Sequence, residues 1–219
     1  MPCLSEKWAR EVWDRLRRAI RIERDSFVVH FARTPFEVLV AIVLSQNTNE
    51  ANAIRALRAL RELTNLKPEN IRNTPIAYIE RAIRPAGMYR QKARTIIEIA
   101  RRVSEGLNLE SILDLDLLSA RQKLLAIPGI GKKTADVFLA IYGKRIMGLD
   151  VHALRIAKRW GFSSKTYDGI QREYIRLFSF VENYDMLHKT LITLGRTYCR
   201  AKRPRCHKCP IGDICPRLI

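Results

Sequence analysis

Residues 118–143 read LSARQKLLAIPGIGKKTADVFLAIYG, and this stretch decides how its part of the chain folds. Apolar residues recur at helical spacing on both sides of the Pro-Gly-Ile-Gly sequence at residues 128–131, which is typical of a tight turn. We expect a first helix capped by Ser119, then the turn, then a second helix from Lys132 to Tyr142. The stretch therefore predicts two helices joined by a short glycine turn.

Such a pair of helices is a helix-hairpin-helix, and its turn suits an anion. Gly129 and Gly131 allow a ligand to approach the backbone, and the N–H groups that open the second helix favour negative charge, such as a DNA phosphate. Lys132 or Lys133 can support that contact, but two adjacent lysines leave one to explain. Either both are solvated helix residues, or one of them performs chemistry.

The composition points to a polyanionic partner. The 219 residues contain 40 Lys and Arg against 22 Asp and Glu, which gives a net charge of +18, and the cations recur along the whole chain. Nucleic acid is the leading expectation, ahead of an anionic membrane surface. The alternative is a basic protein whose charge serves only solubility. A hydrophobic content of 47% is enough for an ordinary core in one domain or two small ones.

The apolar spacing is helical over nearly the whole chain, and no run of strand length alternates with a period of two. We therefore predict an all-α protein with about ten helices and short loops. One N-terminal helix of about 15 residues carries a single apolar stripe. Its members are Trp8, Val12, Leu16 and Ile20.

Several residues mark where helices should begin and end. Thr34 and Thr74 each precede a proline and are predicted to cap a helix, with Glu37 completing a capping box for the first. Four glycines follow periodic segments and are predicted to end helices. They are Gly87, Gly106, Gly143 and Gly161.

No segment has the character of a membrane span or a signal peptide. The longest apolar run, Val38 to Leu44, is well short of the about 20 residues that a membrane helix needs. The first ten residues, MPCLSEKWAR, carry charges before any apolar stretch. We expect a cytoplasmic protein that is associated with the nucleoid.

Asp150 lies 17 positions after Lys133, in the segment MGLDVHALRIAKRWG at residues 147–161. It directly precedes an amphipathic helix, so one hypothesis is that it only caps that helix. The other is that it assists a lysine nucleophile, because a carboxylate can accept a proton from an amine or stabilise positive charge. For His152 we favour a polar position in the first helical turn over a catalytic role.

Four cysteines lie in the last 21 residues, with the spacing Cys199-x6-Cys206-x2-Cys209-x5-Cys215. In a reducing compartment such a group is typical of metal ligands. Four thiolates suit either a zinc ion or a [4Fe-4S] cluster, although zinc sites usually have two short Cys pairs separated by a spacer. Cys3 is left over, and we expect a buried or free thiol. Basic residues surround the cysteines and predict a phosphate-contacting loop, unless they are simply solvated. They are Arg200, Lys202, Arg203, Arg205 and Lys208.

The sequence LAIPGIGKKTAD followed by GLDVH and four cysteines resembles the endonuclease III branch of the helix-hairpin-helix DNA glycosylase superfamily. PFEVLVAIVLSQNT and GMYRQKARTI also match segments of that branch, so the resemblance covers essentially the whole chain. It implies that Lys133 is the catalytic lysine and Asp150 the catalytic aspartate, and that Lys132 lies near phosphate. It also implies that the four cysteines hold a [4Fe-4S] cluster, which fastens the short tail and has no open position for substrate.

The resemblance further implies two helical domains with a DNA cleft between them. Residues 28–145 would form a six-helix domain with the hairpin, and residues 1–27 and 146–219 the iron–sulfur domain. Enzymes of this kind extrude a nucleotide and fill the gap with a wedge. Met88 matches one wedge position. The other falls on Asn47, one residue after the glutamine Gln46, so which of the two inserts is open. The chain departs from some relatives in having Leu125 where they have an acidic residue.

The implied activity is that of a bifunctional DNA glycosylase and AP lyase. It would bind double-stranded DNA as a monomer and remove oxidised pyrimidines through a lysine Schiff base and β-elimination. A second hypothesis is a monofunctional mismatch or adenine glycosylase, but those relatives usually have Ser or Tyr in place of the lysine, and the adenine enzymes carry a further C-terminal domain. A third is a non-catalytic DNA-binding module, against which Asp150 and the whole-chain resemblance argue.

Overall fold

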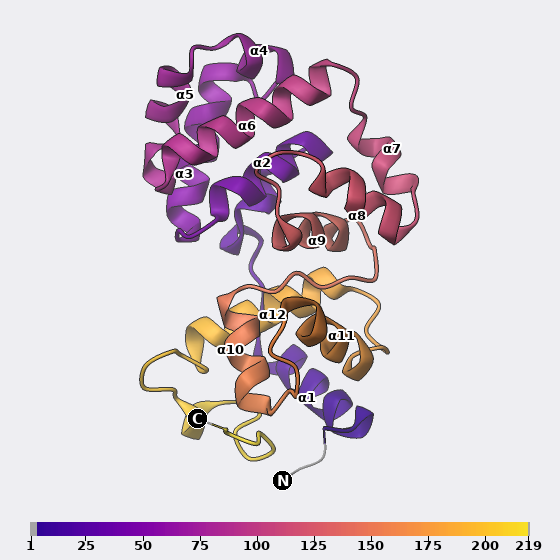
Figure 1. Ribbon diagram of the computed structural model, residues 1–219. Helices are drawn as coiled ribbons and strands as arrows, with labels where there is room; N and C mark the ends of the chain where they lie inside the picture. Colours follow the sequence, from indigo (N-terminus) through magenta and orange to yellow (C-terminus); the bar gives the residue numbers. More distant parts are fainter. Residues whose placement is uncertain (1–3, 219) are drawn as a thin grey trace. The chain divides into compact units, whose positions relative to one another are not determined.

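The structure is a computed structural model, which describes residues 4–218, the side chain of Arg24 apart. Cys3 lies outside the described residues. These residues form helices and no β-strand, which confirms the all-α prediction (Figure 1). The chain divides into two compact units, Glu23–Leu139 and Met1–Ile22 with Ala140–Ile219. Both borders fall a few residues before the expected ones at 28 and 145.

The larger unit is an assembly of short helices around α2. Its elements are η1 (Arg24–Ser26), η2 (Val28–Phe31), α2 (Pro35–Ser45), α3 (Glu50–Thr64), α4 (Pro68–Asn73), α5 (Ile76–Ala82), η3 (Arg84–Ala86), α6 (Tyr89–Ser104), α7 (Leu109–Asp114), α8 (Leu117–Leu125) and α9 (Lys132–Ile141), whose last two residues fall in the other unit. The apolar run at residues 38–44 is buried throughout. A helix that is apolar on all sides is a central core helix, and α2 lies in the middle of this unit in Figure 1.

The start of α2 is fixed largely as predicted. Thr34 caps the helix, because its hydroxyl oxygen accepts a hydrogen bond from the N–H of Glu37 at 3.2 Å. The predicted capping box does not close on Thr34 itself. Instead, the Glu37 carboxylate accepts from the N–H of Arg33 at 2.8 Å and pairs with Arg61 at 2.9 Å. The ion pair fastens α3 to the first turn of α2.

Two other predicted caps are wrong. The first hairpin helix is capped by Asp116, whose carboxylate accepts a hydrogen bond from the N–H of Ser119 at 3.1 Å. Ser119 therefore lies inside the first turn of α8. Asp116, three residues earlier, already accepts the hydrogen bonds at the start of this helix. The hydroxyl of Thr74 donates to the carbonyl of Asn70 at 2.7 Å and closes α4, while α5 begins after Pro75 with no side-chain cap.

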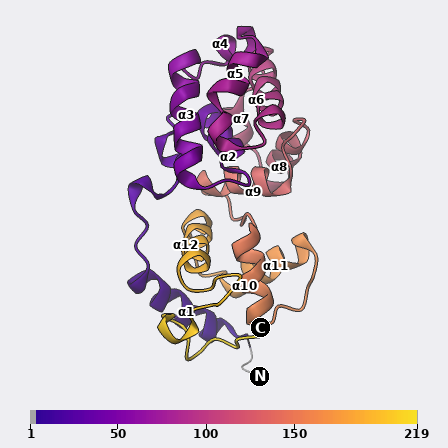
Figure 2. The same cartoon turned by 90° about the vertical axis from the view of Figure 1, so that its left-hand side faces the viewer.

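The second unit surrounds an aromatic core. It contains α1 (Glu6–Ala19), α10 (Val151–Trp160), α11 (Tyr167–Leu177), α12 (Tyr184–Thr197) and η4 (Cys206–Lys208). Trp160 packs edge-on against Trp8 of α1, with ring centroids 5.1 Å apart, and also contacts Tyr174. The indole N–H of Trp8 donates to the carbonyl of Ile214 at 2.9 Å, which fastens the C-terminal segment to α1. Figure 2 draws the C-terminal segment near α1.

The predicted apolar stripe of α1 is buried, and its members are Trp8, Val12, Leu16 and Ile20. The four glycines predicted to end helices all have positive φ and follow helical segments. Within residues 4–218, no helix is both long and apolar enough to cross a membrane.

Candidate functional site

The predicted helix-hairpin-helix is formed by α8 and α9. Gly129 has φ of 88°, and a Cβ atom there would overlap the side chain of Thr95 on α6, so this position requires glycine. The carbonyl of Gly131 accepts the first hydrogen bond of α9, from Ala135 at 3.0 Å. A Cβ built at Gly131 would have no neighbour within 4 Å. The backbone at Gly131 therefore has open space beside it.

A buried ion pair sets the position of the two hairpin helices. Arg121 on α8 donates two hydrogen bonds to the carboxylate of Asp136 on α9, at 2.6 and 3.1 Å. Asp136 is completely buried. A bidentate Arg–carboxylate pair fixes both distance and orientation, so it aligns α9 with the turn that precedes it. The sequence analysis missed this pair, since its partners are 15 residues apart on different helices.

The two lysines of the hairpin differ in their surroundings. Lys132 is exposed, whereas Lys133 is half-buried in the first turn of α9. The amine of Lys133 forms no hydrogen bond or ion pair with the described residues of its own unit. It is therefore available for a reaction partner from outside.

Asp150 lies in the other unit and caps α10. Its Oδ1 atom accepts hydrogen bonds from the N–H groups of His152 and Ala153, at 3.0 and 2.8 Å. The capping role that the sequence suggested is thus present. Both bonds go to Oδ1, and Oδ2 accepts no hydrogen bond within the described part of this unit. Capping and a chemical role for the second oxygen are compatible.

His152 is a half-buried residue in the first turn of α10. Its Nδ1 atom lies 2.8 Å from a guanidinium nitrogen of Arg155, which can only donate, so Nδ1 is the acceptor. Burial lowers the pKa of His152 and favours the neutral ring. A Cβ atom at Gly195 would overlap this ring, so the glycine allows α12 to approach α10. This arrangement agrees with the non-catalytic interpretation.

The candidate wedge residues belong to two neighbouring loops of the larger unit. Gln46 ends α2, and its amide donates to the hydroxyl of Thr134 on α9 at 3.0 Å, so this side chain faces the hairpin. Asn47 is exposed, and its amide nitrogen lies 3.4 Å from the sulfur of Met88. Met88 is 50% exposed. The structure brings the side chains of Asn47 and Met88 together, whereas the Gln46 side chain is hydrogen-bonded to Thr134.

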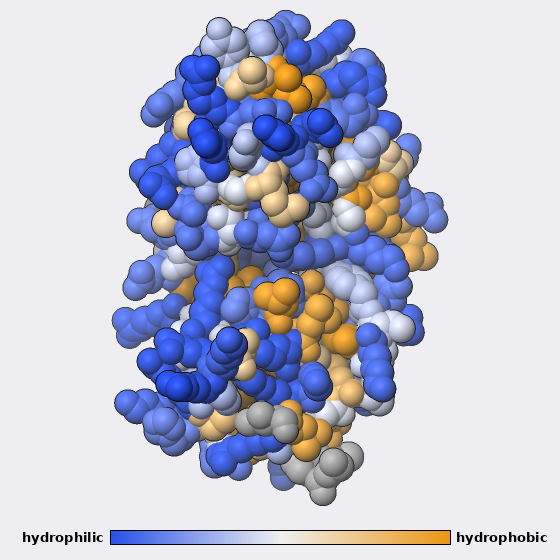
Figure 3. Space-filling view, turned by 60° about the vertical axis from the view of Figure 1, so that its left-hand side comes forward, coloured by the Kyte–Doolittle hydropathy of each residue, from blue (hydrophilic) through white to orange (hydrophobic). Residues whose placement is uncertain are grey.

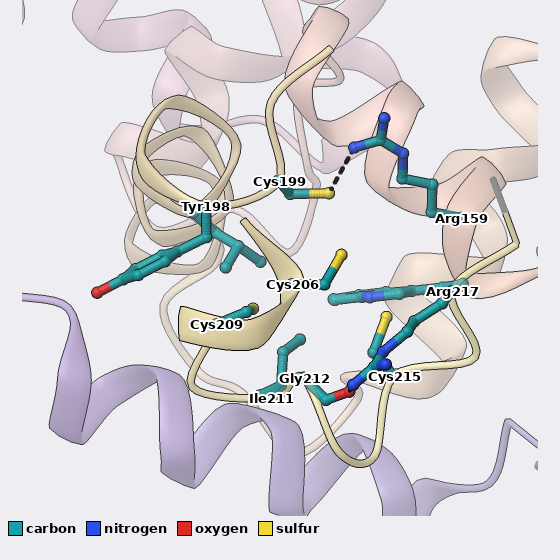
Figure 4. Close-up of a pocket in the computed structure, with 11 residues that line it drawn as sticks. Arg159, Tyr198, Cys199, Cys206, Cys209, Ile211, Gly212, Cys215 and Arg217 are labelled. Carbon is teal, nitrogen blue, oxygen red and sulfur yellow. Dashed lines mark hydrogen bonds between the residues drawn. The ribbon is translucent and has the colours of Figure 1, made fainter. Parts of the chain in front are cut away.

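All four C-terminal cysteines line one cavity of about 30 Å³, and none forms a disulfide (Figure 4). They share its wall with apolar residues and with Arg159, which donates to the Cys199 sulfur at 3.2 Å. Burial raises the pKa of the Cys209 thiol to about 11 and raises that of Cys215 as well. Within residues 4–218, no three His, Cys, Asp or Glu side chains are arranged to hold a single metal ion.

Arg203 and Arg205 are exposed on the loop between the first two of these cysteines. The N–H of Arg205 donates to the carbonyl of Tyr198 at 2.8 Å, which fixes the base of the loop beside the end of α12. Both guanidinium groups therefore point from a fastened loop towards solvent. Hydrophilic residues dominate the face that Figure 3 shows.

Comparison with known proteins assigns the family. Residues 40–179 match the model of the HhH-GPD superfamily of base excision DNA repair proteins. Endonuclease III of Sulfolobus acidocaldarius is 34% identical over 94% of this chain and 95% of its own length. The chain belongs to the endonuclease III branch of the helix-hairpin-helix DNA glycosylases. Endonuclease III of Escherichia coli is 31% identical, with 83% of both chains covered.

Solved structures of the same family share the fold. The structure of a non-covalent endonuclease III–DNA complex has a TM-score of 0.79 and 25% identity, over 96% of this chain and 95% of that chain. A trapped covalent intermediate of endonuclease III with DNA has a TM-score of 0.76 at the same identity. The all-helical, two-unit architecture is therefore that of endonuclease III.

One buried cation of this endonuclease III family member escaped the sequence analysis. Lys92 on α6 is only 2% exposed, and its amine donates hydrogen bonds to three backbone carbonyls. Its only signal in the sequence is a lysine within the GMYRQKARTI segment. Nothing in the spacing of that segment indicates that this cation, rather than its neighbours Arg90 and Arg94, turns inward.

Proposed function

We propose that this base excision repair glycosylase removes oxidised pyrimidines from duplex DNA and then cuts the strand as an AP lyase. The family likeness extends over nearly the whole chain and supports this class of reaction. The observation that carries the lyase part is Lys133, a half-buried amine in the first turn of α9 that forms no hydrogen bond or ion pair with the described residues of its own unit. Because the substrate is chromosomal DNA, we place the protein at the nucleoid.

In the proposed reaction Lys133 is the nucleophile. Its neutral amine attacks C1′ of the damaged nucleotide, and the glycosidic bond breaks, so that the base leaves with the bonding electrons and takes up a proton. Opening of the sugar gives a Schiff base between C1′ and the lysine nitrogen. Removal of a C2′ proton then expels the 3′ phosphate by β-elimination, and water releases the enzyme from the remaining sugar.

Asp150 supports the first step in this proposal. A lysine is protonated at neutral pH, so a carboxylate must accept its proton or stabilise the positive charge that develops on the sugar. Oδ2 accepts no hydrogen bond from the described residues of its unit, while Oδ1 accepts two from the start of α10. The capping bonds fix the carboxylate and leave one oxygen for the reaction.

The proposed contacts to DNA are of two kinds, those to the phosphate backbone and those to the bases. We assign the phosphate contacts to the open turn at Gly129 and Gly131, to Lys132 at the start of α9, and to the exposed Arg203 and Arg205. Such contacts would bind damaged and undamaged duplexes alike, because the phosphate backbone is the same in both.

We assign the wedge to Asn47 and Met88, because these two exposed side chains touch each other while Gln46 is turned towards Thr134. Insertion of side chains into the stack accompanies extrusion of the damaged nucleotide. The wedge and the pocket for the extruded base would therefore distinguish damaged nucleotides from undamaged ones.

Cys199, Cys206, Cys209 and Cys215 would hold a [4Fe-4S] cluster. Four thiols around one cavity, all free of disulfides, fit the all-cysteine ligand set of such a cluster. When bound, it supplies structural cross-linking, since four cysteine ligands leave no position for a substrate. It would fasten the loop that carries Arg203 and Arg205, and no step of the reaction passes through it.

Incubation with a panel of duplexes, each containing one defined lesion, tests the function. Products are resolved with and without hot alkali, which cleaves any abasic site that the enzyme leaves intact. The proposal expects cleavage at oxidised pyrimidines such as thymine glycol without alkali. Cleavage that appears only after alkali would indicate a monofunctional glycosylase. No cleavage of any duplex would contradict an enzymatic role.

A further inference from the structure

Lys92 is a fully buried cation outside the catalytic group. Its Nζ atom donates hydrogen bonds to the carbonyl oxygens of Leu44 at 2.9 Å, Gln46 at 2.6 Å and Ala86 at 2.7 Å. An ammonium group has three N–H donors, so these carbonyls use all of them. Burial of a cation is unfavourable unless its donors are satisfied, and here they are satisfied by backbone alone.

The three carbonyls come from two different segments. Leu44 and Gln46 belong to the C-terminal end of α2, where carbonyl groups have no partner inside the helix. Ala86 ends η3 and precedes the Gly87-Met88 turn by which the chain enters α6. The backbone N–H of Lys92 also donates to the carbonyl of Met88 at 3.0 Å. Lys92 therefore joins the loop before α3 to the loop before α6.

Both loops carry a residue in a strained backbone conformation. Asn47 has φ of 50° and Met88 has φ of 46°, in the left-handed region. This region is unfavourable for residues with a side chain, and Asn tolerates it better than Met. Such conformations persist only where the surrounding structure imposes them. The hydrogen bonds of Lys92 lie immediately beside both residues.

We propose that Lys92 is a positioning residue for nucleotide extrusion. Its buried ammonium group holds the loop at residues 46–47 against the loop at residues 86–88, so that Asn47 and Met88 enter the duplex as one preformed wedge. The inference rests on the proposed function, because it presupposes that the enzyme extrudes a nucleotide. Preorganisation matters here because side chains that are already placed lose less entropy when they insert.

The protonated form of Lys92 is the one that this role requires. Burial lowers its pKa to about 8, while three carbonyl oxygens favour the charged amine. At neutral pH the group therefore remains an ammonium ion with three donors. A neutral amine would have only two and would release one of the carbonyls.

The test compares Lys92→Met with the wild type on two substrates. One is a duplex with thymine glycol, which requires extrusion. The other is single-stranded DNA with an abasic site, whose sugar can be reached without opening a base pair. Single-turnover cleavage of the duplex should fall at least tenfold in the variant. Cleavage of the single strand should stay within about twofold of the wild type, because Lys133 is untouched.

Ile99→Ala is the matched control, because Ile99 is buried on the same helix and makes none of these hydrogen bonds. Ile99→Ala should change the cleavage rates of the two substrates by the same factor. Equal losses on both substrates in Lys92→Met would overturn the inference, and so would unchanged duplex cleavage. If Lys92→Met does not fold, Lys92→Arg replaces it, since a planar guanidinium keeps the charge but cannot direct three bonds from one nitrogen. Lys92→Arg should likewise lose duplex cleavage while it keeps single-strand cleavage. If it does not show this difference, the inference is overturned.

A double-mutant cycle with Met88→Ala tests whether Lys92 acts through the wedge. If it does, the combined variant should lose about as much duplex cleavage as the more damaged single variant. If the factors by which the two single variants lower duplex cleavage multiplied in the combined variant, Lys92 and Met88 would act independently, and the inference would be overturned. A wild type that cleaves neither substrate would instead contradict the proposed function, so the two failures can be told apart.

Discussion

The side-chain amide of Asn47 lies 3.4 Å from the sulfur of Met88, across 41 residues of sequence. This contact joins two exposed loops of the larger unit and places a polar and an apolar side chain next to each other at the surface. The neighbouring Gln46 is hydrogen-bonded to the hairpin helix instead. The contact therefore provides a physical reason to choose Asn47, rather than Gln46, as the partner of Met88.

Replacing both wedge residues, Asn47→Ala with Met88→Ala, should lower excision from duplexes by about tenfold or more, because nothing then fills the gap left by the extruded nucleotide. A fluorescent base analogue opposite the lesion reports extrusion directly and should lose its signal change. Gln46→Ala is the comparison. If Gln46→Ala abolished extrusion while Asn47→Ala did not, the wedge would be assigned to the wrong residue.

Asp150→Asn separates capping from catalysis. Asn caps a helix about as well as Asp, so the free energy of unfolding should change by less than about 1 kcal/mol. Loss of the charge should lower glycosylase turnover roughly a hundredfold or more, because the lysine loses its proton acceptor. Stability and single-turnover rates are measured on the same preparation. Near-normal rates with normal stability would leave Asp150 as a cap only.

Arg203→Ala combined with Arg205→Ala should weaken binding to lesion and intact duplexes alike. Each phosphate contact releases condensed counterions, so the slope of log affinity against log salt should fall by up to about 2. A matched control removes two exposed cations near α4, through Lys67→Ala and Arg72→Ala. If both double variants changed the slope equally, the effect would be one of net charge and not of the loop.

The cysteine loop should bind iron. Purified protein is expected to be yellow-brown, with broad absorbance near about 400 nm and about four irons per chain, as an all-cysteine [4Fe-4S] centre implies. Metal analysis and the absorbance spectrum check this. Cys209→Ala should lose the colour and destabilise the second unit, whose tail is then held mainly by the Trp8 and Arg15 contacts. A colourless chain with one zinc ion would contradict the assignment.

The sequence predicted the helical class, the hairpin and the start of α2 because each depends on local spacing. The Pro-Gly-Ile-Gly turn needs glycine at a position with positive φ, and Thr34 caps α2 directly before the proline of its first turn. The caps at Ser119 and Thr74 were wrong for a related reason. Several side chains near a helix start can accept the same N–H groups, and local sequence does not rank Asp116 against Ser119.

What the sequence could not provide was long-range pairing. Lys92 is one of three cations within five residues of α6, and only the assembled unit shows that its neighbours are exposed while it reaches three carbonyls. The Arg121–Asp136 pair is similarly invisible, since both residues are also ordinary on a solvated helix face. Family resemblance predicts which residues react, but it does not predict the residues that pair with Lys92 or Arg121.

The most direct measurement of the central claim is borohydride trapping on a duplex that contains an abasic site, performed with Lys133→Gln and Lys132→Gln. Reduction of a Schiff base makes the link between enzyme and DNA permanent, so it reports the covalent nucleophile. We predict that Lys133→Gln abolishes trapping while retaining most DNA affinity, and that Lys132→Gln still traps with somewhat weaker binding. Trapping by Lys133→Gln that matched the wild type, or its loss only in Lys132→Gln, would contradict the account.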